Sequence, residues 1–168
     1  MAPRPLPCCE IDGFPGWSWR ALARADLPLA WPLARLVGVA RDLEGWLDLA
    51  GRWLAQAAAE GGGVGALVNP AGLFVGLERH RPRPGHRSNG TALEAEAVLE
   101  VPWLVALEVT PEPRCHAALL SALAGCARAW GYARIRLART GPTVDLLDRI
   151  AARFDLVAEP DGWWRRID

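Results

Sequence analysis

The segment around position 114 has the residue types and spacing to bind an anion. It reads as an apolar strand (WLVALEVT, 103–110), a turn (PEPR, 111–114) and a helix rich in Ala and Leu, expected over Cys115–Trp130. A helix that follows a buried strand directly presents backbone N–H groups and the positive end of its dipole. We therefore expect the backbone amides of residues 115–119 and the Arg114 side chain to form an anion site.

The same residues also fit a purely structural interpretation. The run Ala117–Leu120 is equally suited to the first turns of a buried helix, and the sequence leaves both interpretations open. Cys115 and His116 share this helix start, where the pKa of a thiol is lowered, so a reactive cysteine is conceivable. A pair of surface side chains is the simpler interpretation, because adjacent residues on a helix do not face each other.

Hydrophobic periodicity and turn residues predict the elements that position this segment. Asp26 is a suitable cap for the first helix, with Pro28 tolerated in its first turn, but Pro32 could instead delay the regular helix until Leu33. In chain order, the expected elements are a strand Trp17–Ala23, a helix that starts after Asp26 or at Leu33, a helix capped by Asp42 and ended by Gly61, a hairpin of Val64–Val68 and Leu73–Leu77 around Asn69-Pro70-Ala71-Gly72, one bulged strand or two over 92–109 with a break at Pro102, the helix Cys115–Trp130, a strand Tyr132–Ala138, a helix from Gly141 to about Arg153, and strands Phe154–Ala158 and Trp163–Ile167.

This order, β-α-α-β-β-β-α-β-α-β-β, predicts an α/β protein with a central mixed sheet and helices on both faces. One parallel crossover should surround the helix Cys115–Trp130. We expect an irregular N-terminal arm over residues 1–16 and a single domain over 17–168.

Composition narrows the classes of function. The chain has 168 residues with 19 basic groups, all of them Arg, and 19 acidic groups, so a net charge of zero argues against nucleic acid and anionic membrane as partners. No apolar run reaches the ~20 residues of a membrane span, and the N-terminus lacks a signal-peptide core, so we expect a cytoplasmic protein. Its four Cys have no zinc-type spacing, and we expect neither a metal nor a disulfide framework.

Several segments resemble the GCN5-related N-acetyltransferase (GNAT) superfamily, over nearly the whole length from residue 17. In this chain, RALARADLPLAWPLARLV resembles the first strand and helix of the family, and LEVTPEPRCHAALLSAL resembles its central strand–loop–helix. WGYARIRLA resembles the strand that follows, and FDLVAEPDGWWRRI resembles the last hairpin. The resemblance implies an acetyltransferase-like fold and an N-acyltransferase that uses acetyl-CoA or another acyl-CoA. The acceptor would be a small-molecule amine or a peptide, and a homodimer is conceivable.

The resemblance also implies roles for single residues. Glu108 would take a proton from the substrate ammonium, directly or through water, and the amide near Val109 would stabilise the oxyanion. A solvent-side Glu in an alternating strand is the structural alternative, and Glu100 and Glu96 are weaker candidates of the same kind. The cofactor-binding residues would be Val109, Thr110, Arg114, Cys115, His116, Ala117, Ala118 and Leu119.

The chain departs from the family pattern at three places. Ala117 replaces the first Gly of the pyrophosphate motif, and Leu119 stands where Gly or Ala is usual. The helix near Arg149 lacks the Tyr that often protonates the leaving thiolate, and Tyr132, the only Tyr, is misplaced for that role. A non-catalytic module that binds a ligand or protein partner is therefore the alternative hypothesis, and an unrelated small α+β domain is the third.

The segment ERHRPRPGHRSNG is expected to be a polar loop after the hairpin. Its Arg79, Arg81, Arg83, Arg87, His80 and His86 could attract an acidic substrate, the 3′-phosphate of the cofactor or RNA. A solvated charge run is the simpler interpretation, because no aromatic residues are interleaved for base stacking.

Overall fold

The structure is a computed structural model that describes residues 9–83, 97–109, 111–139 and 144–167. Among these residues, no helix is long and apolar enough to cross a membrane. The elements are β1 (Cys9–Ile11), β2 (Phe14–Ala21), a 3₁₀ turn (Arg24–Asp26), α1 (Leu27–Leu36), α2 (Leu43–Glu60), β3 (Gly63–Val68), β4 (Phe74–Arg83), β5 (Val98–Ala106), α3 (Arg114–Ala129), β6 (Arg134–Ala138), α4 (Val144–Ile150), a 3₁₀ turn (Ala151–Phe154), β7 (Val157–Glu159) and β8 (Gly162–Arg166).

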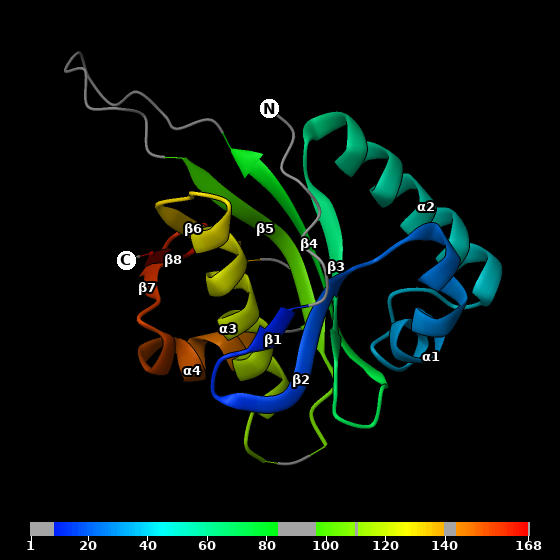
Figure 1. Cartoon of the computed structure of the whole chain (residues 1–168), viewed down its shortest axis with the longest axis horizontal. Coiled ribbons are helices and arrows are strands. Elements are labelled where there is room, and N and C mark those ends of the chain that lie inside the picture. Colours follow the sequence, from blue (N-terminus) through cyan, green and yellow to red (C-terminus); the bar gives the residue numbers. More distant parts are fainter. Residues whose placement is uncertain (1–8, 84–96, 110, 140–143, 168) are drawn as a thin grey trace.

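The strands form one eight-stranded sheet in the order β1-β2-β3-β4-β5-β6-β8-β7. Only β5 and β6 are parallel, because α3 carries the chain from the end of one to the start of the other. Figure 1 shows α1 and α2 on one side of the sheet and α3 and α4 on the other. The predicted fold class, a mixed sheet with one parallel crossover and helices on both faces, is therefore confirmed.

Two hydrophobic clusters lie on opposite faces of the sheet. The cluster under α3 includes Trp19, Leu99, Leu123 and Trp163, and the cluster under α1 and α2 includes residues such as Trp46 and Leu77. Side chains alternate between the two faces along a strand, so the central strands β3, β4 and β5 contribute to both clusters.

Capping and turn residues fix the ends of several elements, as the sequence predicted. The Asp42 carboxylate accepts the Gly45 N–H at 2.7 Å at the start of α2, and Gly61 ends that helix with φ 75°. In the β3–β4 hairpin, the Asn69 side chain accepts the N–H groups of Ala71 and Leu73, each at 3.0 Å.

Of the two starts left open for the first helix, the one directly after Asp26 is confirmed and the delay to Leu33 is wrong. Helix α1 begins at Leu27 and contains Pro32. Its buried face, which includes Leu27 and Leu33, packs on the sheet, and the Trp46 indole N–H donates to the Leu27 carbonyl at 2.7 Å. Burial and this bond offset the hydrogen bond that the proline removes. The Asp26 side chain binds the Arg20 guanidinium and the Ala23 N–H, each at 2.9 Å, and does not cap α1.

Other boundaries differ from the predictions where pairing across the sheet decides the structure. The arm expected over residues 1–16 contains β1 and the start of β2, which pair antiparallel. Residues 80–83 continue β4 instead of opening a loop, because they pair with β5. The segment expected as a strand from Phe154 to Ala158 is a 3₁₀ turn followed by the shorter strand β7.

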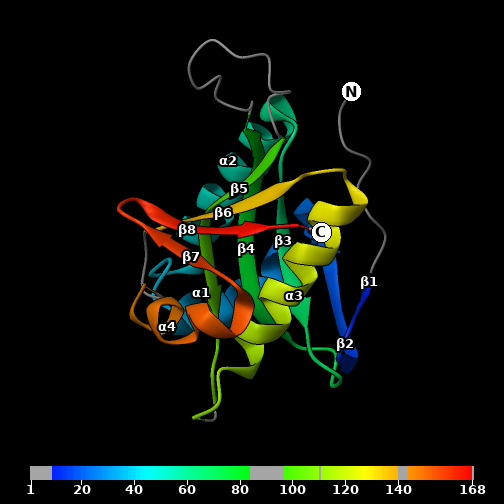
Figure 2. The ribbon, with the colours of Figure 1, turned by 90° about the vertical axis from the view of Figure 1, so that its left-hand side faces the viewer.

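Strand β5 is one bulged strand, and it diverges from β6. Arg79 pairs with Trp103 and Arg81 with Glu100, so one intervening residue of β4 lies opposite two of β5. Past this bulge, the β5 face that packs under α3 changes from odd to even positions. The ladder with β6 runs from Val98 to Val101 and ends before Pro102, which has no N–H to donate. Figure 2 shows β6 and β8 running across the direction of β3, β4 and β5.

Candidate functional site

The candidate site lies where the chain leaves β5 and enters α3. Strand pairing ends near Leu107, whose N–H donates to the Val75 carbonyl at 2.8 Å. Helix α3 then starts at Arg114, and Pro113 in the capping position offers no side-chain acceptor to its first N–H groups. Another acceptor is therefore needed at this helix start.

The Glu108 carboxylate supplies that acceptor. One oxygen accepts the Cys115 N–H at 3.2 Å, and the other accepts the His116 N–H at 2.7 Å. The second oxygen also lies 2.8 Å from Nδ1 of the His116 ring. The next amide, that of Ala117, donates to the Pro113 carbonyl at 2.9 Å as an ordinary helical bond. Glu108 thus binds the positive end of α3 as an external anion would.

These bonds set the charge state of the site. Burial alone would raise the pKa of Glu108, but hydrogen bonds from the His116 ring and from the amides of His116 and Cys115 outweigh it and lower that pKa. Burial, followed by the nearby Glu108 charge, raises the pKa of the Cys115 thiol to about 12. The site therefore holds a carboxylate and a neutral thiol at neutral pH.

The predicted site residues fall into an exposed group and a buried group. Val109 is 83% exposed, and Arg114 is also exposed. Cys115, His116, Ala118 and Leu119 are buried on the sheet side of α3, and Ala117 is half-buried. Thr110 lies outside the described residues. The chain thus brings the predicted residues together, but most of the helix start faces the core.

Two expectations about this helix start are wrong. The amides of Cys115 and His116 are not open to an anion, because Glu108 already binds both. No residue pattern predicts this contact, since the loop that returns the carboxylate to the helix has no periodicity. Cys115 and His116 are also not a surface pair: they are 7% and 2% exposed. Cys115 is not activated either, because its thiol pKa is raised.

A fully buried acidic group on β4 was not predicted from the sequence. Glu78 is 0% exposed, and its carboxylate lies 3.0 Å and 3.1 Å from Nδ1 of His80 and accepts the Trp19 indole N–H at 3.3 Å. Burial alone would lower the pKa of His80, but the charge of Glu78 and its hydrogen bond raise it. Glycine at position 65 leaves room for this group, because a Cβ there would overlap Glu78 and Trp19. The sequence feature that could have indicated this buried group is the acidic residue Glu78 directly after the apolar residues of a hairpin strand.

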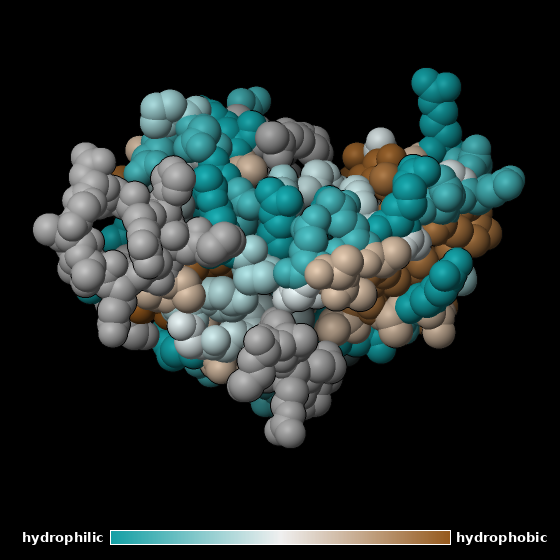
Figure 3. Space-filling view, turned by 90° about the horizontal axis from the view of Figure 1, so that it is seen from above, coloured by the Kyte–Doolittle hydropathy of each residue, from teal (hydrophilic) through white to brown (hydrophobic). Residues whose placement is uncertain are grey.

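The arginines of the expected polar loop are mostly paired. Arg79 and Arg81 lie 3.9 Å and 3.8 Å from Glu60, and Arg81 Nε donates to Glu100 at 2.7 Å. Glu100 also binds Arg83 and Arg136, at 3.4 Å and 2.5 Å. His86, Arg87 and Glu96 lie outside the described residues. Figure 3 shows hydrophilic side chains over this end of the molecule, with apolar side chains gathered on the α1–α2 side.

Within the described ranges, no group of three or more His, Cys, Asp or Glu side chains could hold a metal ion.

The predicted Glu100 role as an alternative base finds no support in its contacts. Burial alone would raise the pKa of Glu100. Its arginine partners, Arg81 above all, outweigh burial and lower that pKa.

Comparison with solved structures identifies the fold. A ribosomal-protein-S5-alanine acetyltransferase from Vibrio fischeri superposes with a TM-score of 0.62 over 95% of this chain and 98% of its own, at 13% identity. A GNAT-family acetyltransferase from Listeria monocytogenes gives a TM-score of 0.53 over 95% and 99%, at 12% identity. This chain has the GNAT fold.

Another GNAT-like structure bears on the cofactor. A Salmonella typhimurium protein assigned as an acetyltransferase, solved with its cofactor acetyl-CoA, gives a TM-score of 0.56 over 91% of this chain and 95% of its own, at 12% identity. No family model and no curated protein matches the sequence. The likeness to GNAT proteins thus lies in the fold.

Proposed function

We propose that this protein is an acyl-CoA-dependent N-acyltransferase that acts on a small-molecule amine or a peptide. The observation that carries the proposal is the divergence of the parallel strands β5 and β6 beside the N-terminus of α3, in a GNAT fold. In open α/β sheets, ligands bind outside the carboxyl ends of such strands. A long helix that starts there adds favourable electrostatics for a pyrophosphate.

The proposed reaction is direct transfer. The acceptor amine attacks the thioester carbonyl, the C–N bond forms as the C–S bond breaks, and the sulfur leaves as coenzyme A thiol after taking up the proton that the amine loses. The backbone amide near Val109 would stabilise the oxyanion. Arg114, which is exposed at the first turn of α3, would bind the pyrophosphate by charge-assisted hydrogen bonds.

Glu108 gives this proposal a specific form. Its carboxylate occupies the amides of Cys115 and His116, so a pyrophosphate can bind them only when Glu108 leaves. Once displaced, Glu108 loses the hydrogen bonds that lower its pKa and becomes a better base. We propose that cofactor binding displaces Glu108 from α3 and frees it to take the proton of the acceptor ammonium.

A thermal-shift titration with acetyl-CoA, propionyl-CoA and longer acyl-CoAs tests the proposal. A ligand at 100 times its dissociation constant should add about 2.7 kcal/mol of apparent stability. Glu108→Gln should bind acyl-CoA more tightly, because the competing negative charge is gone, yet transfer the acyl group more slowly. Glu159→Gln, on the exposed strand β7, is the matched control and should change neither property. The absence of any shift in both the native protein and Glu108→Gln contradicts the proposal.

One observation favours a second candidate, a non-catalytic GNAT-fold module. Glu108 caps α3, and Leu119 is 0% exposed beside it, so the helix start is complete without a ligand. Leu119→Gly separates the two candidates. Gain of acyl-CoA affinity by Leu119→Gly in a protein that otherwise binds none identifies a degenerate site, whereas binding by the native protein supports the enzyme.

A further inference from the structure

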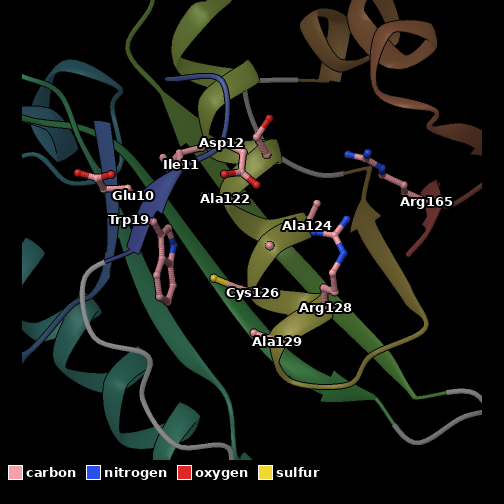
Figure 4. Close-up of a pocket in the computed structure, with 12 residues that line it drawn as sticks. Glu10, Ile11, Asp12, Trp19, Ala122, Ala124, Cys126, Arg128, Ala129 and Arg165 are labelled. Carbon is pink, nitrogen blue, oxygen red and sulfur yellow. The ribbon is translucent and has the colours of Figure 1, made fainter. Parts of the chain in front are cut away.

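A groove crosses α3 far from its N-terminus. It has a volume of about 330 Å³ and is lined by the β1–β2 hairpin, the C-terminal half of α3 and Arg165 of β8. Figure 4 shows Glu10 on one side of this part of α3 and Arg165 on the other. A volume near 300 Å³ is at the lower end for pockets that bind small molecules. None of the residues that line the groove belongs to the cofactor site proposed above, so the two sites are separate.

The two sides of the groove carry opposite charges. Glu10 and Asp12 lie on the β1–β2 hairpin, whereas Arg128 and Arg165 lie on α3 and β8. Within the part of the chain that the structure describes, no ion pair engages Glu10, Asp12 or Arg165. A ligand that brings a positive charge to one side and a negative charge to the other would therefore meet complementary partners.

The middle of the groove lets a ligand approach the helix closely. Ser121, Gly125 and Ala129 follow each other at intervals of four residues and present small side chains there. Gly125 is exposed, and a Cβ added at this position would meet no atom within 4 Å. The space over Gly125 is therefore open.

The base of the groove is rigid, because Trp19 beneath it is only 1% exposed and is held in place from behind. Trp19 lines the groove, its indole N–H donates to buried Glu78 at 3.3 Å, and its ring meets that of Trp130 edge-on at 6.0 Å. A base fixed in this way does not have to be ordered when a ligand binds, which favours binding.

From these observations we infer that the groove binds a small zwitterion whose two charges lie at opposite ends of the molecule, namely a dipeptide. The ammonium group faces Glu10 and Asp12, and the carboxylate faces Arg128 and Arg165. The small residues of α3 contact the carbon skeleton, above the buried Trp19. This binding does not depend on the proposed acyl transfer, since it uses none of the residues at the start of α3.

Isothermal titration with a set of dipeptides tests the inference, using N-acetylated and C-amidated forms of the best dipeptide as probes, together with free amino acids, which should bind weakly because both their charges are on one carbon. Saturable binding should require both charged ends. Arg165→Gln and Asp12→Asn should each weaken it by about tenfold or more, because each removes a charge-assisted bond. Arg166→Gln, next along the same strand and absent from the groove lining, is the matched control and should leave affinity unchanged.

Gly125→Leu provides a second variant that should fold well, because leucine favours a helix and the position is open. Its side chain would fill the groove and abolish binding. Glu108→Gln should leave binding intact, which distinguishes this site from the acyl-CoA site. No binding of any probe by the native protein overturns the inference. So does equal binding of the free and the end-blocked ligands, or equal weakening by Arg165→Gln and Arg166→Gln.

Discussion

Glu108 and His116 meet twice at the start of α3. One Glu108 oxygen accepts the His116 backbone N–H at 2.7 Å and lies 2.8 Å from Nδ1 of the His116 ring. The residue in the capping position, Pro113, has no side chain able to cap. A carboxylate from the preceding loop therefore replaces the usual local cap and also fixes the orientation of a buried ring.

Removal of this carboxylate should destabilise the fold. Glu108→Ala leaves the amides of Cys115 and His116 without their acceptor, and we expect a loss of about 1–2 kcal/mol in the free energy of unfolding. Urea denaturation measures this loss. Glu159→Ala on β7 is the control and should change stability by less than about 0.5 kcal/mol. Equal stabilities of the two variants would show that Glu108 does not bind α3 in solution.

The contribution of Glu108 should also depend on pH. Its pKa is lower in the folded protein than the ordinary value of 4.5. A group with a depressed folded pKa stabilises the fold fully above its unfolded pKa and loses that effect as pH falls through the folded pKa. The stability difference between the native protein and Glu108→Ala should be constant above about pH 5.5 and shrink below pH 4.5. A difference that stays constant down to pH 3 contradicts this account.

The Cys115 thiol should be inert in the folded protein. With its pKa raised to about 12, roughly one part in ten thousand is thiolate at pH 8, and the side chain is buried. We expect a Cys8→Ser/Cys9→Ser variant to release no thiol signal with a disulfide reagent until it is unfolded, when Cys115 and Cys126 both react. Rapid reaction of one thiol under native conditions would show that the start of α3 opens.

Gly65 should tolerate no side chain. A Cβ there would overlap Glu78 and Trp19, so Gly65→Ala must displace a buried carboxylate or a buried indole. We expect a loss of about 1–3 kcal/mol, measured by denaturation. Gly51→Ala is the matched control, because Gly51 lies inside α2 with nothing within 4 Å of the added Cβ, and this variant should be slightly more stable.

The buried Glu78–His80 pair should make stability fall as pH rises. The net effect of its surroundings raises the pKa of His80 above 6.5, because the charge of Glu78 and its hydrogen bond outweigh burial. A raised folded pKa stabilises the fold fully below the unfolded pKa, and the effect is lost as pH rises through the folded pKa. His80→Ala should cost about 3–5 kcal/mol at pH 6, because Glu78 is left buried without its partner.

Denaturation at several pH values from 6 to 9 checks this prediction. The cost of His80→Ala should be largest at pH 6 and should decrease as His80 loses its proton. A cost that is independent of pH would mean that His80 is neutral throughout and that the pair is an ordinary hydrogen bond.

Local signals predicted much of the fold. Asp42 and Gly61 mark the ends of α2, and Asn69 and Gly72 mark the hairpin turn, because each acts through backbone groups only a few residues away. The parallel crossover followed from the strand–helix–strand order around the helix Cys115–Trp130. Strand β1 could not be predicted in the same way, because three residues carry no periodicity and the strand depends on pairing with β2.

The candidate site was predictable in place but not in chemistry. The strand-to-helix junction was visible in the sequence, and the structure confirms that α3 follows β5 there. The sequence did not show which group accepts hydrogen bonds from the first helix amides, because the Glu108 side chain reaches them through a turn that no residue pattern predicts. Burial of Glu78 and His80 likewise depends on the side-by-side placement of β2, β3 and β4.

The burial of α3 has a consequence for how the protein opens. Ten of its sixteen residues are buried, and β1, the central strands and β6 all contact it. The helix cannot detach while these neighbours stay in place. Amide protons in the middle of α3 should therefore exchange with solvent only when the whole domain unfolds, whereas those of α4 can exchange through local fraying.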